Sequence, residues 1–161
     1  MILGDKMIKV LFVCLGNICR SPMAEGLFKK LVKDMGYEEC FHIESRATSN
    51  WELGNPPHPG TIKILSRLNI STDHMSSEKI ESKDFKEFDY IIGMDHDNVR
   101  YLKNQGKNYI EKIYLLRDVS LKTKGEIVPD PYYTGKYEET YQLLMESLPL
   151  WVEKMILEKG C

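Results

Sequence analysis

Residues 13–22 read Val-Cys-Leu-Gly-Asn-Ile-Cys-Arg-Ser-Pro, and this stretch decides the fold because it joins a strand to a helix. Upstream, residues 8–13 are largely apolar and rich in β-branched side chains, which predicts a buried parallel strand. Ser21 and Pro22 are typical of the N-cap and the first position of a helix. Backbone N–H groups converge in such a loop, so the sequence predicts an anion-binding site between the strand and the helix.

Strand and helix patterns alternate along the rest of the chain, which is the order that builds a parallel sheet with helices on both faces. We therefore expect an α/β fold: a three-layer α/β/α domain with a four-stranded parallel sheet and the anion-binding loop after its first strand. The expected strands cover residues 8–13, 41–48, 90–94 and 110–116, and the longest expected helices cover residues 22–35 and 137–157.

The side chains of the loop suit nucleophilic attack on a phosphate ester. The helix dipole, the loop amides and Arg20 are expected to lower the pKa of Cys14, and a thiolate at neutral pH is a competent nucleophile. The planar fork of Arg20 can hold two phosphate oxygens at once. Ser21 is placed to donate to the sulfur, and Asn17 is expected to fix the loop's shape. The candidate phosphate-binding residues are Leu15, Gly16, Asn17, Ile18, Cys19 and Arg20.

Other interpretations of this stretch fit less well. Cys14 would be a small buried residue and Arg20 a surface charge if the spacing had no function, but their placement between a strand and a helix start favours function. Nucleotide binding is disfavoured because the turn has neither a Gly-x-Gly-x-x-Gly nor a Gly-Lys-Ser/Thr pattern. A Cys-x-x-Cys redox motif is absent as well.

A phosphate monoester also needs its leaving oxygen protonated, and Asp130 is the candidate acid. It lies between Pro129 and Pro131, where a constrained backbone and aromatic neighbours can hold a carboxyl and partly desolvate it. From the residues alone a turn aspartate is an equal alternative, since Asp and Pro often mark turns. Weaker candidates for the acid are Asp95, Asp97 and Asp118.

The chain resembles the low-molecular-weight protein tyrosine phosphatases nearly end to end. The matching segments are residues 13–22, the Ser45-Arg46-Ala47-Thr48 stretch ahead of Trp51, residues 88–95, and Asp130-Pro131-Tyr132-Tyr133. The resemblance implies hydrolysis of phosphotyrosine through a phosphocysteine on Cys14, without a metal or other cofactor. It also implies that Asp130 acts first as general acid and then as general base. It further implies that His74 supports Ser21, although His96 stands where the family has a glutamate.

Substrate choice is expected to come from apolar and aromatic walls around the phosphate. Such walls suit an aryl phosphate, and a deep slot favours phosphotyrosine over phosphoserine. Ordinary core packing remains the alternative for each aromatic residue. The expected wall residues are Leu15, Ile18, Trp51, Tyr132 and Tyr133. The two tyrosines are also candidate phosphorylation sites.

Cys19 lies five residues after Cys14, which predicts a disulfide between them once an oxidant has converted the thiolate to a sulfenic acid. A buried structural thiol is the alternative for Cys19. The four cysteines form no dense framework, which favours a reducing compartment and leaves Cys40 and Cys161 as incidental residues.

Composition narrows the class of protein. The 161 residues fit one domain, expected over residues 7–161, with residues 1–6 as an extension that is disordered or artificial. The net charge is −2 from 22 basic and 24 acidic residues without long runs, which argues against nucleic acid and anionic membranes as partners. A cytoplasmic monomer, or a weakly self-associating one, is expected, with phosphotyrosine proteins as substrates and phosphate-like oxyanions as inhibitors.

Two other functions remain open. A thiol-dependent arsenate reductase on the same fold would use the same loop, but it would need further cysteines in the middle of the chain, where none occurs. A phosphate-binding module without activity would not need Cys14, Arg20 and Asp130 together.

Overall fold

A computed structural model describes residues 7–161, so the expectation for residues 1–6 lies outside the described part. Its centre is a four-stranded parallel sheet in the order β2-β1-β3-β4. The strands are β1 (Ile8–Cys14), β2 (Phe41–Ala47), β3 (Tyr90–Gly93) and β4 (Ile113–Leu115). The expected parallel α/β fold is confirmed.

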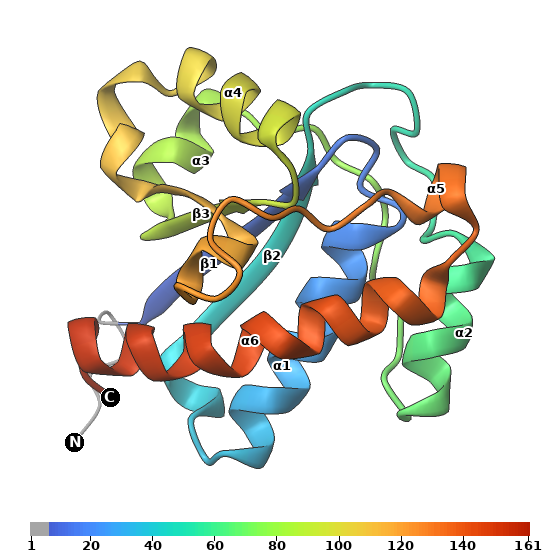
Figure 1. Cartoon of the computed structure of the whole chain (residues 1–161), viewed down its shortest axis with the longest axis horizontal. Helices are drawn as coiled ribbons and strands as arrows, with labels where there is room; N and C mark the ends of the chain where they lie inside the picture. Colours follow the sequence, from blue (N-terminus) through green and yellow to red (C-terminus); the bar gives the residue numbers. More distant parts are fainter. Residues whose placement is uncertain (1–6) are drawn as a thin grey trace.

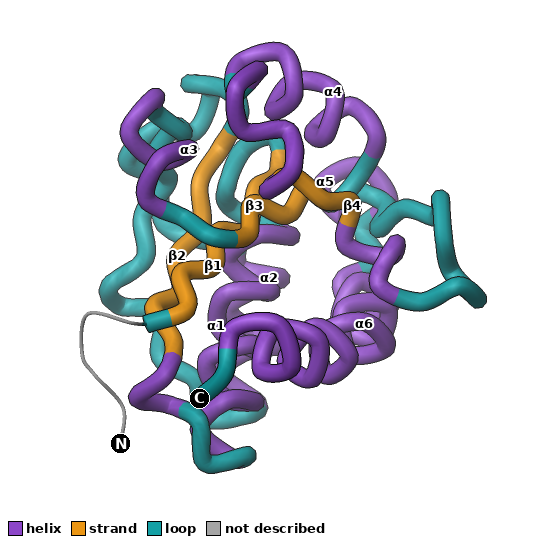
Figure 2. The backbone as a smooth tube through the Cα atoms, turned by 90° about the vertical axis from the view of Figure 1, so that its left-hand side faces the viewer, coloured by secondary structure: helices purple, strands orange, loops and turns teal. Residues whose placement is uncertain are grey.

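Helices cover both faces of this sheet. They are α1 (Arg20–Asp34), α2 (Pro59–Arg67), α3 (Ser82–Glu87), α4 (His96–Gln105), α5 (Pro131–Thr134) and α6 (Tyr137–Lys159). In Figure 1, α1 and α6 lie on one side of the sheet and α3 and α4 on the other. Figure 2 shows the same three layers after a quarter turn, with the strands between the two sets of helices.

The core consists of two apolar clusters, one on each face, because successive side chains of β1 point to opposite faces. Phe12 packs edge-to-face on Phe28 of α1, with ring centroids 5.3 Å apart. Leu11 belongs to the other cluster, which includes Phe85 of α3. Burial on both faces holds β1 rigidly, and its last residue, Cys14, is the first residue of the loop described below.

Helix α1 begins earlier than the sequence indicated. Its first residue is Arg20 and its N-cap is Cys19, whereas Ser21 was expected to be the cap. Ser21 lies inside the first turn because its hydroxyl is engaged by Cys14 and Asn17 instead of capping the helix.

Cys40 and Cys161 are joined by a disulfide, so their interpretation as incidental residues is wrong, and the cysteine pattern no longer argues for a reducing compartment. Helix α6 runs back across α1 and brings the C-terminal residue to the start of β2 (Figure 1). The two Cα atoms are 5.9 Å apart although 121 residues separate them in the chain. The remaining cysteines of the described chain, Cys14 and Cys19, are free.

Candidate active site

The loop after β1 is held from outside by its carbonyl oxygens. The Leu15 carbonyl accepts from Ser49 Oγ at 2.8 Å, and the Gly16 carbonyl accepts from Ser77 Oγ at 2.9 Å. The Ile18 carbonyl accepts from the His58 N–H at 2.8 Å, and the Cys19 carbonyl accepts from Thr61 Oγ1 at 3.1 Å. The backbone N–H groups of residues 15–20 have no acceptor within residues 7–161. A curled loop with outward carbonyls and free N–H groups is a cradle for an oxyanion.

Cys14 lies at the floor of this cradle and is 3 % exposed. Its Sγ is 3.1 Å from the Ser21 hydroxyl oxygen, and the Ser21 N–H points at the same sulfur across 3.4 Å. The hydroxyl and the backbone N–H of Ser21 thus both lie within hydrogen-bonding distance of the sulfur. The first turn of α1 therefore positions the candidate nucleophile.

Asn17 holds the shape of the loop. Its backbone is left-handed, with φ of 57°, a conformation that asparagine tolerates better than most residues. Its Nδ2 donates to Ser21 Oγ at 2.7 Å and to Ser45 Oγ at 3.0 Å, while its Oδ1 accepts from the Glu78 N–H at 3.1 Å. One buried amide thus ties the loop to β2 and to the segment before α3.

Arg20 is buried beside the loop and held by two partners on its Nη1. That nitrogen donates to Asp95 Oδ2 at 2.7 Å and to the Val128 carbonyl at 2.9 Å. Burial opposes the charge of the guanidinium, but the neighbouring charges of Cys14, Asp95 and Asp130 raise the pKa of Arg20 above its usual value. Within residues 7–161 its Nε is buried without a hydrogen-bond partner, so one donor of the fork is free for a ligand.

Asp130 meets Arg20 from the far side of the site. Its Oδ2 is 3.4 Å from Arg20 Nη2, and its Oδ1 accepts from the Tyr132 N–H at 3.1 Å as the N-cap of α5. The short helix fixes the carboxylate at the mouth of the loop. Of the acidic candidates, Asp130 lines the pocket described next, whereas Asp95 lies on Arg20 and Asp97 pairs with Arg100 on the surface.

A pocket of about 190 Å³ joins the candidate nucleophile, acid and walls. Its rim is aromatic: Trp51 is 73 % exposed and Tyr133 71 % exposed, so neither is a core residue. The ring plane of Tyr133 is nearly perpendicular to that of Tyr132 beside it. The lining residues are Cys14, Leu15, Gly16, Ile18, Cys19, Trp51, Glu52, Asp130, Tyr132 and Tyr133. The structure therefore brings together all five of the expected walls.

Cys19 also faces this pocket, but its environment differs from that of Cys14. Its Sγ is 3.5 Å from the Tyr137 hydroxyl. Burial raises the pKa of Cys19 to about 12, and the hydrogen bond from Tyr137 only partly offsets that effect. Cys19 is accordingly a neutral thiol at physiological pH.

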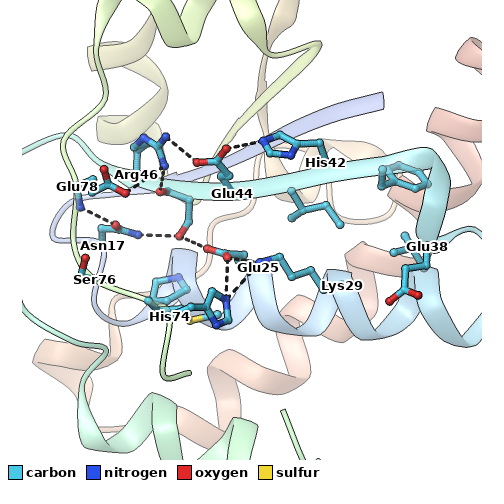
Figure 3. A pocket seen from close by; sticks show the side chains of 16 residues that line it. Asn17, Glu25, Lys29, Glu38, His42, Glu44, Arg46, His74, Ser76 and Glu78 are labelled. Atoms are coloured by element: carbon cyan, nitrogen blue, oxygen red, sulfur yellow. Dashed lines mark hydrogen bonds and ion pairs between the residues drawn. The ribbon is translucent and has the colours of Figure 1, made fainter. Parts of the chain in front are cut away.

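His74 does not touch Ser21, the residue it was expected to support. Its Nε2 is 3.8 Å from Glu25 Oε2, and Glu25 Oε1 accepts from Ser45 Oγ at 2.6 Å (Figure 3). Because Ser45 in turn accepts from Asn17, His74 reaches the loop serine only through Glu25, Ser45 and Asn17. The direct partner of the Ser21 hydroxyl is Asn17.

His96 lies away from the pocket. Its Nε2 is 2.9 Å from the Gly125 carbonyl oxygen, so it holds the loop ahead of Asp130 rather than the phosphate cradle.

Two residues of the site were not assigned their observed roles from sequence. Asp95 orients Arg20, and Glu52 forms part of the pocket rim. The position of Asp95 contained a usable signal: it follows β3 directly, and β3 pairs with β1, so both strands end at the same edge of the sheet. Glu52 carried no comparable signal.

The described residues contain neither a metal-binding cluster nor a membrane-spanning helix. No group of three or more His, Cys, Asp or Glu residues among them is arranged to hold a metal ion. No helix in the same part of the chain is long and apolar enough to cross a membrane.

The model of one protein family, low molecular weight phosphotyrosine protein phosphatase, matches residues 9–159. The chain belongs to this family. Among curated relatives of this phosphatase family, YfkJ of Bacillus subtilis is 46 % identical over 139 residues, 86 % of this chain and 89 % of the relative. PtpA of Staphylococcus aureus (strain MRSA252) is 44 % identical over 141 residues, 88 % of this chain and 89 % of the relative. Both are named low molecular weight protein-tyrosine-phosphatases, which confirms the enzyme class expected from the sequence.

Solved structures agree with this assignment. The crystal structure of YfkJ from Bacillus subtilis has a TM-score of 0.91 and 43 % identity, covering 95 % of this chain and 97 % of that one. The phosphatase SP-PTP from Streptococcus pyogenes has a TM-score of 0.81 and 49 % identity, with 92 % and 93 % covered.

Proposed function

We propose that this protein hydrolyses phosphotyrosine in proteins, and aryl phosphates generally, without a metal ion and through a phosphocysteine on Cys14. Membership of the phosphatase family supports the general activity, hydrolysis of a phosphate ester. The observation that carries the mechanism is the set of free donors around the Cys14 sulfur: the N–H groups of residues 15–20 and the buried Nε of Arg20. Such donors match the equatorial oxygens of a phosphate in transfer.

In the first step the Cys14 thiolate attacks the phosphorus atom, and the bond from phosphorus to the phenolic oxygen breaks. Asp130 gives its proton to that oxygen, so tyrosine leaves as a neutral phenol. Arg20 and the loop N–H groups hold the three equatorial oxygens as they redistribute their charge. Asp95 keeps the guanidinium in place through its 2.7 Å bond to Nη1.

In the second step the phosphocysteine is hydrolysed. Asp130, now a carboxylate, takes a proton from a water molecule as the water oxygen attacks phosphorus. The S–P bond breaks, inorganic phosphate forms, and the electron pair returns to the Cys14 sulfur. The Ser21 hydroxyl, 3.1 Å from that sulfur, stabilises the departing thiolate.

Substrate choice follows from the pocket's shape and walls. An aryl ring can lie between Trp51 and the pair Tyr132 and Tyr133 while its phosphate reaches Cys14. A phosphoserine side chain is shorter and has no ring to contact these walls, so it binds less well. The exposed aromatic rim suits a protein substrate that projects a phosphotyrosine from its surface.

The free cysteines support reversible oxidative inactivation. Peroxide would oxidise the Cys14 thiolate to a sulfenic acid, and the Cys19 thiol would then form a disulfide with it, releasing water. Both residues line the same pocket. If Cys19→Ser recovers from peroxide with added thiol as completely as wild type, Cys19 has no protective role.

The arsenate reductase alternative is disfavoured by the cysteines. Such chemistry needs thiols beyond the loop to carry away oxidising equivalents. In the described chain Cys40 and Cys161 are bonded to each other, which leaves Cys19 as the only other free thiol.

The proposal extends to the protein's setting. We place it in the cytoplasm as a monomer or weakly associating protein, with phosphotyrosine proteins as substrates and phosphate-like oxyanions as inhibitors that occupy the Cys14 loop. The balanced charge of 22 basic against 24 acidic residues does not favour nucleic acid or anionic membranes as partners.

The test is hydrolysis of p-nitrophenyl phosphate at mildly acidic pH with a chelator and a reductant present. Wild type should turn over, Cys14→Ser should be inactive, and Asp130→Asn should be slowed strongly. Cys19→Ser is the matched thiol control and should retain turnover. Rapid acid quenching followed by mass spectrometry should find phosphate on the peptide that contains Cys14. An inactive wild type would refute the phosphatase mechanism and favour assays of arsenate reduction.

A further inference from the structure

A groove larger than the catalytic pocket lies behind the catalytic loop, along the outer edge of β2. It has a volume of about 480 Å³, within the range of ligand sites. Every residue of Phe41–Arg46 lines it. Because successive side chains of a strand point to opposite faces, a cavity that touches six consecutive residues runs along the strand's edge.

That edge carries unpaired backbone groups. Strand β2 is an edge strand of the sheet. Its inner edge is hydrogen-bonded to β1, and its outer edge has no neighbouring strand among the described residues. Ala47 donates to the Glu78 carbonyl and accepts from the Ile80 N–H, so both of its backbone groups point outward. The next residue, Thr48, donates to the Cys14 carbonyl, so it points inward to β1.

The backbone N–H and C=O groups of successive strand residues point alternately to the two edges, which gives the direction of the other groups in β2. The N–H and C=O of Ile43 and of Ser45 point outward like those of Ala47. Within residues 7–161 only the Ser45 carbonyl has a partner, a 2.9 Å bond from Arg46 Nη1. Of these four groups on Ile43 and Ser45, three therefore remain unpaired within this range: the N–H and C=O of Ile43 and the N–H of Ser45.

The two residues that carry these groups are buried as whole residues. Ile43 is 7 % exposed and Ser45 8 % exposed, because α1 forms the opposite wall of the groove and the segment before α3 closes one end. Figure 3 looks onto this edge, with His42, Glu44 and Arg46 on one side of the strand and Glu25 on the other. Sheltered backbone donors and acceptors at two-residue spacing are complementary to one extended peptide backbone.

The charges of the groove select the kind of peptide. Four glutamates line it against one lysine and one arginine: Glu25, Glu38, Glu44 and Glu78 against Lys29 and Arg46. Glu25 and Glu44 already pair with basic neighbours. Glu38, three residues ahead of β2, forms no ion pair with any described residue. A basic side chain near that end would complete the pairing.

We propose that the outer edge of β2 binds an extended peptide segment bearing a lysine or arginine, which adds to the sheet as a further strand. The chain itself shows this mode once, where Lys79 forms a single parallel bridge to Ala47 at the end of the same edge. A second copy of this chain fits less well. Each copy's edge is recessed beside its own α1, so two such edges cannot approach to hydrogen-bonding distance.

The test uses the full chain, ¹⁵N-labelled, and the synthetic peptide acetyl-Lys-Thr-Val-Thr-Val-Lys-amide. Hydrogen exchange measured by NMR should slow at least tenfold for the N–H of Ile43 and Ser45 when the peptide is bound. The N–H groups of His42 and Glu44 point to β1 and should not change. A peptide with N-methylated backbone nitrogens should give no protection, and one with glutamate for lysine should bind at least threefold more weakly.

Protein variants separate backbone pairing from side-chain contact. Ile43→Pro removes one outward N–H and should weaken peptide binding at least tenfold, whereas Ile43→Ala keeps that N–H and should weaken it less. Glu38→Gln should reduce affinity for the lysine peptide but not for the glutamate peptide. If Ile43→Pro does not fold, the N-methylated peptide still decides the question.

Three outcomes would overturn the proposal. The first is unchanged exchange at Ile43 and Ser45 with the lysine peptide in excess. The second is equal protection by the N-methylated peptide. The third is protection of the same amides by raising the protein concentration alone, together with a doubled mass, which would make the edge a self-association surface.

Discussion

Arg20 and Asp130 form an ion pair, with 3.4 Å between Nη2 and Oδ2, although 110 positions separate them in the chain. The proposed general acid therefore rests, in the free protein, on the group proposed to bind phosphate. An entering oxyanion must compete with this carboxylate for the guanidinium.

Asp130→Asn should separate catalysis from binding. We expect kcat for phenyl phosphate to fall by about 10²–10⁴, because an amide cannot protonate the leaving oxygen. Inorganic phosphate should inhibit the variant more tightly than wild type, because one negative charge beside Arg20 is gone. Asp97→Asn, at an exposed ion pair with Arg100, is the control and should change neither value. Weaker phosphate inhibition in Asp130→Asn would contradict the competition.

Asn17→Ala should destabilise the protein and reduce its activity. The change removes the side chain that bonds Ser21, Ser45 and the Glu78 N–H, so unfolding should become easier by on the order of 1–3 kcal/mol. Urea denaturation and kcat/KM measure the two effects. Asn69→Ala is a matched control, since Asn69 has a similar φ of 60° but is exposed. Equal losses in both variants would mean that backbone strain, not hydrogen bonding, is responsible.

Trp51→Ala should raise KM for a phosphotyrosine peptide about two- to thirteenfold, since an aromatic contact contributes roughly 0.5–1.5 kcal/mol beyond its buried area. Inhibition by inorganic phosphate should not change, because the ring lines the rim of the pocket and not its floor. Leu53→Ala removes another exposed apolar side chain, one outside the pocket, and should leave KM as it is. An unchanged KM in Trp51→Ala would remove this residue from the substrate walls.

The two free cysteines should differ in alkylation. Because burial raises the pKa of Cys19 to about 12, its thiolate fraction is very small at pH 8 and grows only as the pH rises toward 12. Iodoacetamide at pH 8 should therefore modify Cys14 first, and bound inorganic phosphate should protect Cys14. Peptide mass spectrometry measures both sites. Faster modification of Cys19 than of Cys14 would contradict their assigned environments.

Cys161→Ser should lower the unfolding free energy by roughly 2–5 kcal/mol, since the disulfide to Cys40 closes a long loop in the unfolded chain. kcat/KM should not change, because neither cysteine lines the catalytic pocket. Urea denaturation with and without a reductant measures the effect. Reductant should destabilise wild type to the level of the variant and leave the variant itself unaffected; a variant that reductant still destabilises would argue against this pairing.

The local sequence pattern was enough to predict much of the site. Cys14, Asn17, Arg20 and Ser21 are covalently close, so a strand before them and a helix after them suffice to bring them together. The exact helix start did not follow, because Ser21 serves Cys14 and Asn17 instead of capping α1. The wall residues follow from their apolar or aromatic character and from the family resemblance, not from spacing.

The sequence by itself determined the α/β class and the chemistry of the loop, because both depend on residues that are neighbours or recur at a fixed period. Only the tertiary structure decided which distant groups meet: Asp95 and Asp130 on Arg20, Glu25 between Ser45 and His74, and Cys161 on Cys40. Within the described chain it also left the outer edge of β2 unpaired at Ile43 and at the Ser45 N–H. These contacts arise from how helices and strands pack around a shared core, and packing between distant segments leaves no periodic signal in the chain.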